Sequence, residues 1–131
     1  MMILSVGIGG ACGAILRYLT SVILTSHFAQ DAWVATLVVN LAGCLIMGIC
    51  AGVILGLSAD TRVLRPYFRS FMMVGFLGGL TTCSRFAFYF HQLFLRYNIG
   101  AAALYLAVSV FCSVLVFYAG LWLIRQVLTE A

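Results

Sequence analysis

Long apolar segments alternate with short polar ones along this chain. Each apolar segment is long enough for a helix that crosses the hydrocarbon core of a bilayer, which needs about 20 residues. Most of the charged residues lie in the short connections between these segments or beyond the last segment. The pattern predicts an all-α membrane protein, with a single domain over residues 1–131 and four transmembrane helices at about residues 2–26, 33–57, 68–95 and 99–124.

The third apolar segment contains a stretch that is unfavourable to a continuous helix. Gly75, Gly78 and Gly79 precede Thr81 and Thr82 near the middle of this segment. Glycine is a weak helix former, although it also lets two helices pack closely. A break at membrane depth needs shelter, because lipid cannot satisfy the freed N–H and C=O groups. We therefore expect either a broken helix that offers backbone groups to an ion, or a glycine-rich packing surface on a continuous helix.

The composition agrees with a membrane location. Hydrophobic residues make up 65% of the chain and charged residues 8%, with a mean hydropathy of +1.18. The net charge of +4 comes from arginine, because the sequence contains no lysine. These arginines lie mostly at the ends of the apolar segments, which favours lipid headgroups over nucleic acid as their partners. Five scattered cysteines indicate small buried hydrophobic residues, not a disulfide framework or a zinc site.

Small residues recur at a spacing of four in the first two segments. Gly9 and Gly13 have this spacing in the first segment, and Gly48, Gly52 and Gly56 have it in the second. Residues four apart share one helix face, and glycines on that face allow close approach of a neighbouring helix. The spacing predicts helix packing.

Polar side chains also lie within the apolar segments. Asn40 is the only amide of the second segment, and a buried amide needs hydrogen-bond partners. It either bonds another helix or points a donor at a solute. Tyr105, Ser109 and Ser113 recur every four residues in the fourth segment. Their hydroxyls either bond their own backbone or form a polar track along one face.

Two arginines lie inside apolar segments. Arg17 either marks the interfacial end of a short span, or it pairs or faces water, because a deep arginine is costly. Arg85 has no carboxylate within the spans to neutralise it. It is expected to face water, an anion or a partner subunit, or to reach the membrane surface along its flexible stem.

The charge distribution bears on topology. Four spans place both termini on one side, together with Arg62, Arg65, Arg69 and Arg125, whereas Arg17 belongs to the other side with Arg96. This mild bias favours internal termini, and it is also typical of a protein that inserts in both orientations. Polar stripes on single helix faces cannot close a pore alone, which indicates a second copy as partner.

Three motifs together resemble one known family. Gly9-Gly10-Ala11-Cys12-Gly13-Ala14 is followed by Arg17-Tyr18, Thr36-Leu37-Val38-Val39-Asn40 by Gly43 and Gly48, and Gly78-Gly79-Leu80-Thr81-Thr82 by Ser84 and Phe86. In order and spacing they resemble the Fluc (CrcB) fluoride channels. The resemblance implies an antiparallel dual-topology homodimer in the bacterial plasma membrane that exports fluoride passively.

The resemblance also implies site residues. Backbone carbonyls of Gly78 and Thr81 would hold a structural sodium ion. The charges of Arg17 and Arg85, and not the resemblance, make these two residues possible vestibule cations. Fluoride is strongly hydrated, so its pore must replace water with N–H and O–H donors, to which the positive edges of aromatic rings can add. The implied fluoride pathway comprises Asn40, Thr82, Ser84, Phe86, Tyr105, Ser109 and Ser113.

The chain departs from the family pattern at four positions. Cys83 replaces a phenylalanine, Arg85 a threonine and Ala87 a serine, and Tyr89 stands where a carboxylate is frequent. These changes keep open a non-conducting or heteromeric channel-derived subunit.

A small proton-coupled multidrug exporter has the same size and span number. It would need a carboxylate at mid-membrane, whereas Asp31, Asp60 and Glu130 lie at span ends. No catalytic constellation is visible, so we expect no enzyme.

Overall fold

Helices account for nearly all of the chain that the structure, a computed structural model, describes, namely residues 2–27, 32–56 and 64–130. The connections that hold Asp31 and Asp60, and residue 57 of the predicted second span, lie outside these residues. The elements are α1 (Met2–His27), α2 (Ala32–Gly56), α3 (Leu64–Phe68), the π-helix η2 (Arg69–Leu77), α4 (Gly78–Leu80), α5 (Cys83–Arg96) and α6 (Ile99–Glu130).

Four helical segments in the described residues are long and apolar enough to cross a membrane. This finding confirms the predicted number of spans, and the third span is built from α3, η2, α4 and α5 in succession. The fourth helix runs a few residues beyond the predicted end at 124. The spans are Met2–Ser26, Ala32–Leu55, Pro66–Arg96 and Ile99–Val127.

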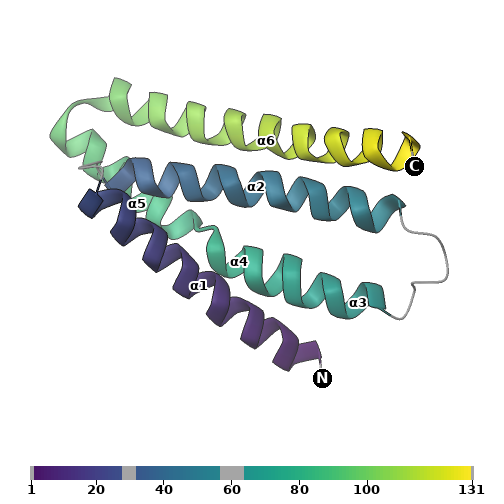
Figure 1. Cartoon of the computed structure of the whole chain (residues 1–131). Coiled ribbons are helices and arrows are strands. Elements are labelled where there is room, and N and C mark those ends of the chain that lie inside the picture. Colours follow the sequence, from purple (N-terminus) through teal and green to yellow (C-terminus); the bar gives the residue numbers. More distant parts are fainter. Residues whose placement is uncertain (1, 28–31, 57–63, 131) are drawn as a thin grey trace.

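The helices form two packed pairs (Figure 1). Helices α2 and α6 lie side by side along most of their length, and α1 packs against η2 and α4. Both termini lie toward the same end of the bundle in this view, as four spans require. Helix α5 lies toward the opposite end and contacts α6 and α2.

Glycines bring α1 and the third span into backbone contact. A Cβ atom on Gly75 would lie 2.7 Å from the carbonyl oxygen of Val6, and one on Gly79 would lie 2.5 Å from that of Gly10. No side chain fits in that space, so these glycines let the two backbones touch. Gly9 and Gly13 meet the third span in the same way.

Two of the three glycines of the predicted ladder, Gly48 and Gly52, also pack closely. A Cβ atom on Gly48 would overlap the carbonyl of Phe117, and one on Gly52 would overlap the Ile124 side chain. Both partners belong to α6, which explains why α2 and α6 stay together along their length.

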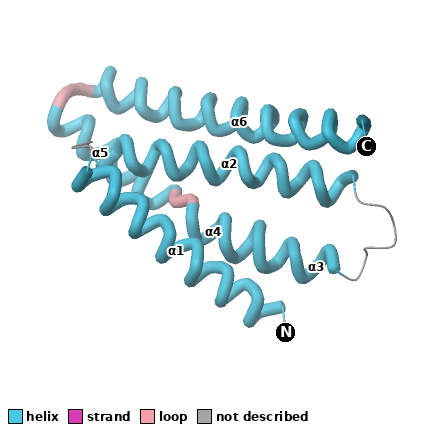
Figure 2. The backbone as a smooth tube through the Cα atoms, viewed as in Figure 1, coloured by secondary structure: helices cyan, strands magenta, loops and turns pink. Residues whose placement is uncertain are grey.

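The regular helix of the third span stops at Leu80 and resumes at Cys83 (Figure 2). Thr81 and Thr82 between them have extended backbone, with φ and ψ of −79° and 153° and of −149° and 123°. Gly75, Gly78 and Gly79 are all helical. Gly75 and Gly79 therefore have the packing role that we gave as one alternative for these glycines. The residues that interrupt the helix are the two threonines that follow.

Candidate functional site

The side chain of Asn40 holds the backbone of Thr82. The Thr82 N–H donates to Asn40 Oδ1 at 2.9 Å, and Asn40 Nδ2 donates to the Thr82 carbonyl oxygen at 3.3 Å. In an uninterrupted α-helix the Thr82 N–H would instead bond the Gly78 carbonyl, four residues earlier. Asn40 thus replaces helical hydrogen bonds at the point where the helix stops.

Thr81 follows the end of α4, and Thr82 is the N-cap of α5. The N–H and Oγ1 of Thr81 both donate to the Leu77 carbonyl at 2.9 Å. The Arg85 N–H donates to Thr82 Oγ1 at 3.4 Å, an N-cap contact for α5. In a continuous helix this N–H would bond the Thr81 carbonyl. In a continuous helix the amides of Thr82 and Arg85 would bond the carbonyls of Gly78 and Thr81. Here these two amides bond the side chains of Asn40 and Thr82 instead.

A groove of about 290 Å³ lies beside this non-helical pair, and we call it the α6 groove. Its walls come from α2, α5, α6 and Thr82. Polar groups predicted from the sequence meet here, although they lie up to 73 positions apart in the chain, from 40 to 113. The lining residues are Asn40, Thr82, Cys83, Phe86, Ser109, Val110, Ser113 and Val114.

Two hydroxyls of the predicted track are buried. Tyr105 is 5% exposed and Ser109 7%, and neither hydroxyl oxygen has a hydrogen-bond partner within the described part of the chain. The Tyr105 ring stacks on Phe86, with ring centroids 5.2 Å apart. Buried hydroxyls are normally hydrogen-bonded, because desolvation of an unpaired one is unfavourable. The site therefore presents donor groups that the described residues leave unused.

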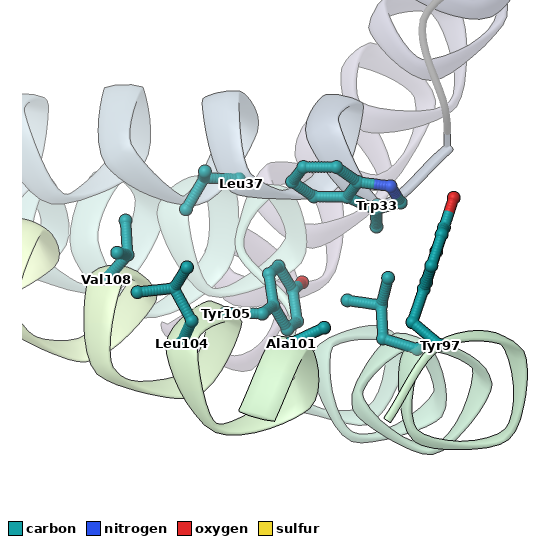
Figure 3. A pocket seen from close by; sticks show the side chains of 8 residues that line it. Trp33, Leu37, Tyr97, Ala101, Leu104, Tyr105 and Val108 are labelled. Carbon is teal, nitrogen blue, oxygen red and sulfur yellow. The ribbon is translucent and has the colours of Figure 1, made fainter. Parts of the chain in front are cut away.

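Tyr105 and Ser84 lie beside the α6 groove and do not line it. Tyr105 lines a separate apolar pocket of about 390 Å³ between α2, α5 and α6. Figure 3 shows its ring below Trp33, and the two ring centroids are 5.8 Å apart. Tyr97 stands at the other side of this pocket (Figure 3). Ser84 is exposed, and its hydroxyl lies 3.2 Å from that of Thr82.

The two predicted vestibule arginines do not line the α6 groove. Arg17 and Arg85 line one recess between α1, α2 and α5, which we call the arginine recess. Arg85 Nη1 donates to Ser21 Oγ of α1 at 3.4 Å. Thr36 and Thr82 also line this recess.

Sequence reasoning missed Val110, Val114 and Ser21 as neighbours of these sites. The two valines cannot be told from lipid-facing residues by hydropathy alone. Ser21 did carry a signal, because it follows Arg17 by four residues and so shares its helix face.

Four helical segments long and apolar enough to cross a membrane, three of which line a groove with polar groups, define a multi-pass membrane protein. The sequence model of the CrcB family, described as CrcB-like protein, Camphor Resistance (CrcB), matches residues 4–121. The chain belongs to this family.

Curated relatives match over almost their whole length. The chain is 46% identical over 125 residues to a fluoride-specific ion channel FluC of Rhodospirillum centenum, covering 95% of each protein. It is 40% identical to a FluC protein of Azotobacter vinelandii, over 93% of this chain and 95% of the relative. A FluC protein of Flavobacterium psychrophilum is 33% identical, over 92% and 94%. The relatives are named as channels, and this chain is likewise not an enzyme.

Proposed function

We propose that this protein is a fluoride channel that lets fluoride leave the cell passively through the α6 groove. The observation that carries the proposal is the gathering of neutral donors there: the Asn40 amide, the Thr82 hydroxyl and the hydroxyls of Ser109 and Ser113. The relatives named fluoride-specific ion channels support the choice of ion.

The chemistry of the groove suits a small, strongly hydrated anion. Such an ion enters only where fixed donors replace its water, and neutral donors let it leave again. The Asn40 amide carries a second N–H besides the one that bonds Thr82. Ser109 lines the groove and adds a hydroxyl donor with no other partner in the described residues, whereas the Tyr105 hydroxyl lies beside the groove. Phe86 contributes a ring whose positive edge is compatible with fluoride.

A second copy in the opposite orientation completes the pore. Val110 and Val114 line the groove yet are 52% and 50% exposed, so one chain supplies only part of the wall. The mild arginine bias of the sequence is compatible with insertion in both orientations. An antiparallel homodimer gives each groove an identical facing surface, and two pores follow from the symmetry. We place this homodimer in the bacterial plasma membrane, because the relatives come from bacteria.

In the proposed dimer, the interruption at Thr81 and Thr82 lies between the two copies, where it is sheltered from lipid and holds a structural sodium ion. The carbonyl oxygens of Gly78 and Thr81 fit such an ion, because the amides that would bond them in a continuous helix bond Asn40 and Thr82 instead. Neutral carbonyl oxygens suit a hard monovalent cation, whose charge would favour anions nearby.

Fluoride efflux from liposomes tests the conduction proposal. The purified chain is reconstituted into vesicles loaded with potassium fluoride, and valinomycin is added to carry the compensating potassium. A fluoride electrode is expected to record rapid efflux, with little release of chloride under the same conditions. Efflux no faster than from protein-free vesicles would exclude the proposal.

The same measurement decides the heteromeric alternative. Cys83 lines the groove at a position where the family pattern has phenylalanine, and a different subunit could supply the missing ring. Conduction by the single purified chain would exclude an obligatory second subunit. Efflux only after mixing with another family member would establish it.

A further inference from the structure

The pocket between α2, α5 and α6 has a size and depth that the channel proposal does not use. We call it the interfacial pocket, and its volume is about 390 Å³. Tyr97 and Val108 lie at its opposite ends (Figure 3). Val108 follows the start of the fourth span at Ile99 by nine residues, which is about 14 Å along the helix axis. The pocket therefore reaches through about half of a hydrocarbon core of about 30 Å, which is the depth of one leaflet.

The walls of the interfacial pocket are apolar and aromatic, and its side is open. Leu104, which lines it from α6, is 65% exposed, and Tyr97 is also exposed. Trp33 and Tyr97 lie at the ends of the second and third spans. Tryptophan and tyrosine are typical of the membrane–water interface, where their rings contact acyl chains and their polar atoms contact head groups. The open side is therefore suited to an acyl chain that enters from the bilayer.

A different face of α6 borders the α6 groove. Val108 lines the interfacial pocket and Val110 lines the groove, and two residues correspond to about 200° around a helix. In the proposed antiparallel dimer the groove faces the second copy. The interfacial pocket then faces lipid, because it lies on nearly the opposite face of α6.

A positive charge stands next to this pocket. The guanidinium carbon of Arg96 lies 5.7 Å from the centroid of the Tyr97 ring, and Tyr97 lines the pocket. Arg96 also lines a surface depression of about 310 Å³ together with Gln92 and Leu95. The one acidic residue within residues 2–27, 32–56 and 64–130 is Glu130, at the far end of α6 (Figure 1). An arginine at the membrane surface attracts anionic lipids, and its planar fork of donors matches a phosphate group.

We propose that this protein binds an anionic phospholipid, with one acyl chain in the interfacial pocket and the phosphate at Arg96. The amide of Gln92 adds a donor for the head group. This inference rests on the proposed dimer, which assigns the groove to the second copy and leaves the pocket to lipid. The bound chain packs against Tyr105, whose ring stacks on Phe86 of the groove. The lipid thus supports a ring contact beside the proposed fluoride pathway.

Native mass spectrometry of the purified protein in a neutral detergent tests the head-group contact. Phosphatidylglycerol and phosphatidylcholine with identical acyl chains are added separately, and the lipids retained by the protein are counted. We expect one tightly bound phosphatidylglycerol per chain and weaker binding of phosphatidylcholine. Arg96→Gln is expected to raise the dissociation constant for phosphatidylglycerol about fivefold and to leave that for phosphatidylcholine unchanged. Arg69→Gln is the matched control, because Arg69 is exposed at the other end of the third span.

A second pair of variants tests the acyl-chain contact. Leu104→Trp places an indole in the interfacial pocket and is expected to weaken binding of both lipids several-fold. Leu115→Trp is the matched control. Leu115 follows Leu104 by eleven residues, or about three turns, so it shares the same face of α6, and it is 66% exposed. It does not line the pocket, and its substitution is expected to leave lipid binding unchanged.

Several results would overturn the lipid site. One is equal affinity of the unmodified protein for the two lipids, and another is an equal effect of Arg96→Gln and Arg69→Gln. If Arg96 instead paired with Asp31, which lies outside the described residues, Arg96→Gln would leave lipid affinity unchanged. Equal binding by the two tryptophan variants would place the acyl chain elsewhere. A Leu104→Trp protein with normal lipid binding and a lost dimer peak in size-exclusion chromatography would show that a second copy covers the pocket.

Failure of the lipid site and failure of the channel are distinguishable. The lipid measurements contain no fluoride, so a negative result leaves the proposed conduction intact. Absence of fluoride efflux from vesicles of the unmodified protein removes the channel, whereas selective retention of phosphatidylglycerol still establishes the lipid site.

Discussion

The seam between α1 and the third span differs sharply from the groove beside α6, although small or polar residues recur every four positions in both. Along the seam, Gly9 and Gly13 leave no room for a side chain, and backbones touch. Along the groove, Ser109 and Ser113 border an open volume of about 290 Å³. The same spacing therefore gives close packing where the residue is glycine, and it lines an open groove where the residue carries a hydroxyl. The seam holds two helices together, and the groove is where we propose that the ion passes.

Substitution in the seam gives the largest expected effect. Gly75→Val places a side chain against the Val6 carbonyl and the Gly9 Cα, at 2.7 and 3.1 Å from the new Cβ. Neither backbone atom can move without separating two helices, so we expect loss of folded protein. Yield and elution profile in size-exclusion chromatography measure this. Gly7→Val is the matched control, because a Cβ there meets nothing within 4 Å. Equal behaviour of the two variants would show that the seam is not tightly packed.

Removal of the Asn40 amide, which lines the groove and holds Thr82 of the third span, ranks next. Asn40→Ala deletes both hydrogen bonds to the Thr82 backbone, and each unpaired buried group costs about 1–3 kcal/mol. We expect the threonine pair to lose its position, with fluoride efflux reduced at least about tenfold. Thr20→Val is the control, since it removes a hydroxyl that bonds only its own helix at the Leu16 carbonyl. Normal efflux with Asn40→Ala would mean that Thr82 is held by other contacts.

Thiol modification distinguishes the groove from the packed interior. Cys83 is exposed and lines the groove, whereas Cys50 is 6% exposed within the core. A bulky methanethiosulfonate reagent is expected to reduce efflux several-fold in the unmodified protein. Cys83→Ser is expected to abolish that sensitivity, and Cys50→Ser to preserve it. Full sensitivity after Cys83→Ser would place the reactive thiol elsewhere.

Loss of one buried hydroxyl gives a smaller effect that separates function from stability. Ser109→Ala removes a donor that has no partner in the described residues. Efflux is expected to fall about threefold to tenfold, while the melting temperature stays equal or rises, because an unpaired buried polar group is removed. A fall in both would show that this hydroxyl has a structural partner in the folded protein. Ser5→Ala, on α1, offers a comparison away from the groove.

Sodium dependence is the mildest expected effect. If the carbonyls of Gly78 and Thr81 hold sodium, the melting temperature should be higher in sodium than in N-methylglucamine at equal ionic strength. The stabilisation by an ion that binds only the folded protein depends on the ion concentration relative to the dissociation constant. Asn40→Ala should weaken the difference, because it frees the Thr82 N–H to bond Gly78. Identical unfolding in both salts would argue against the ion.

Much of the fold could be predicted from the sequence, because hydropathy is a property of each local segment. The length of each apolar segment alone predicts four spans, and the structure places them within a few residues of those bounds. Glycine spacing likewise predicts which helix faces pack closely. Only part of the candidate site could be predicted from the sequence. Asn40 was recognisable as a buried amide, but its partner lies 42 residues away, and two alternatives remained open until the structure joined it to Thr82.

The sequence by itself determined that the chain is a helical membrane protein with donors on single helix faces, since composition and periodicity follow from the residues. Tertiary structure decided that the helix stops at the threonines, that Arg17 and Arg85 share a recess, and that Tyr105 stands beside the groove. These arrangements depend on contacts between distant segments. Such contacts form only when helix packing brings their side chains within hydrogen-bond or van der Waals distance.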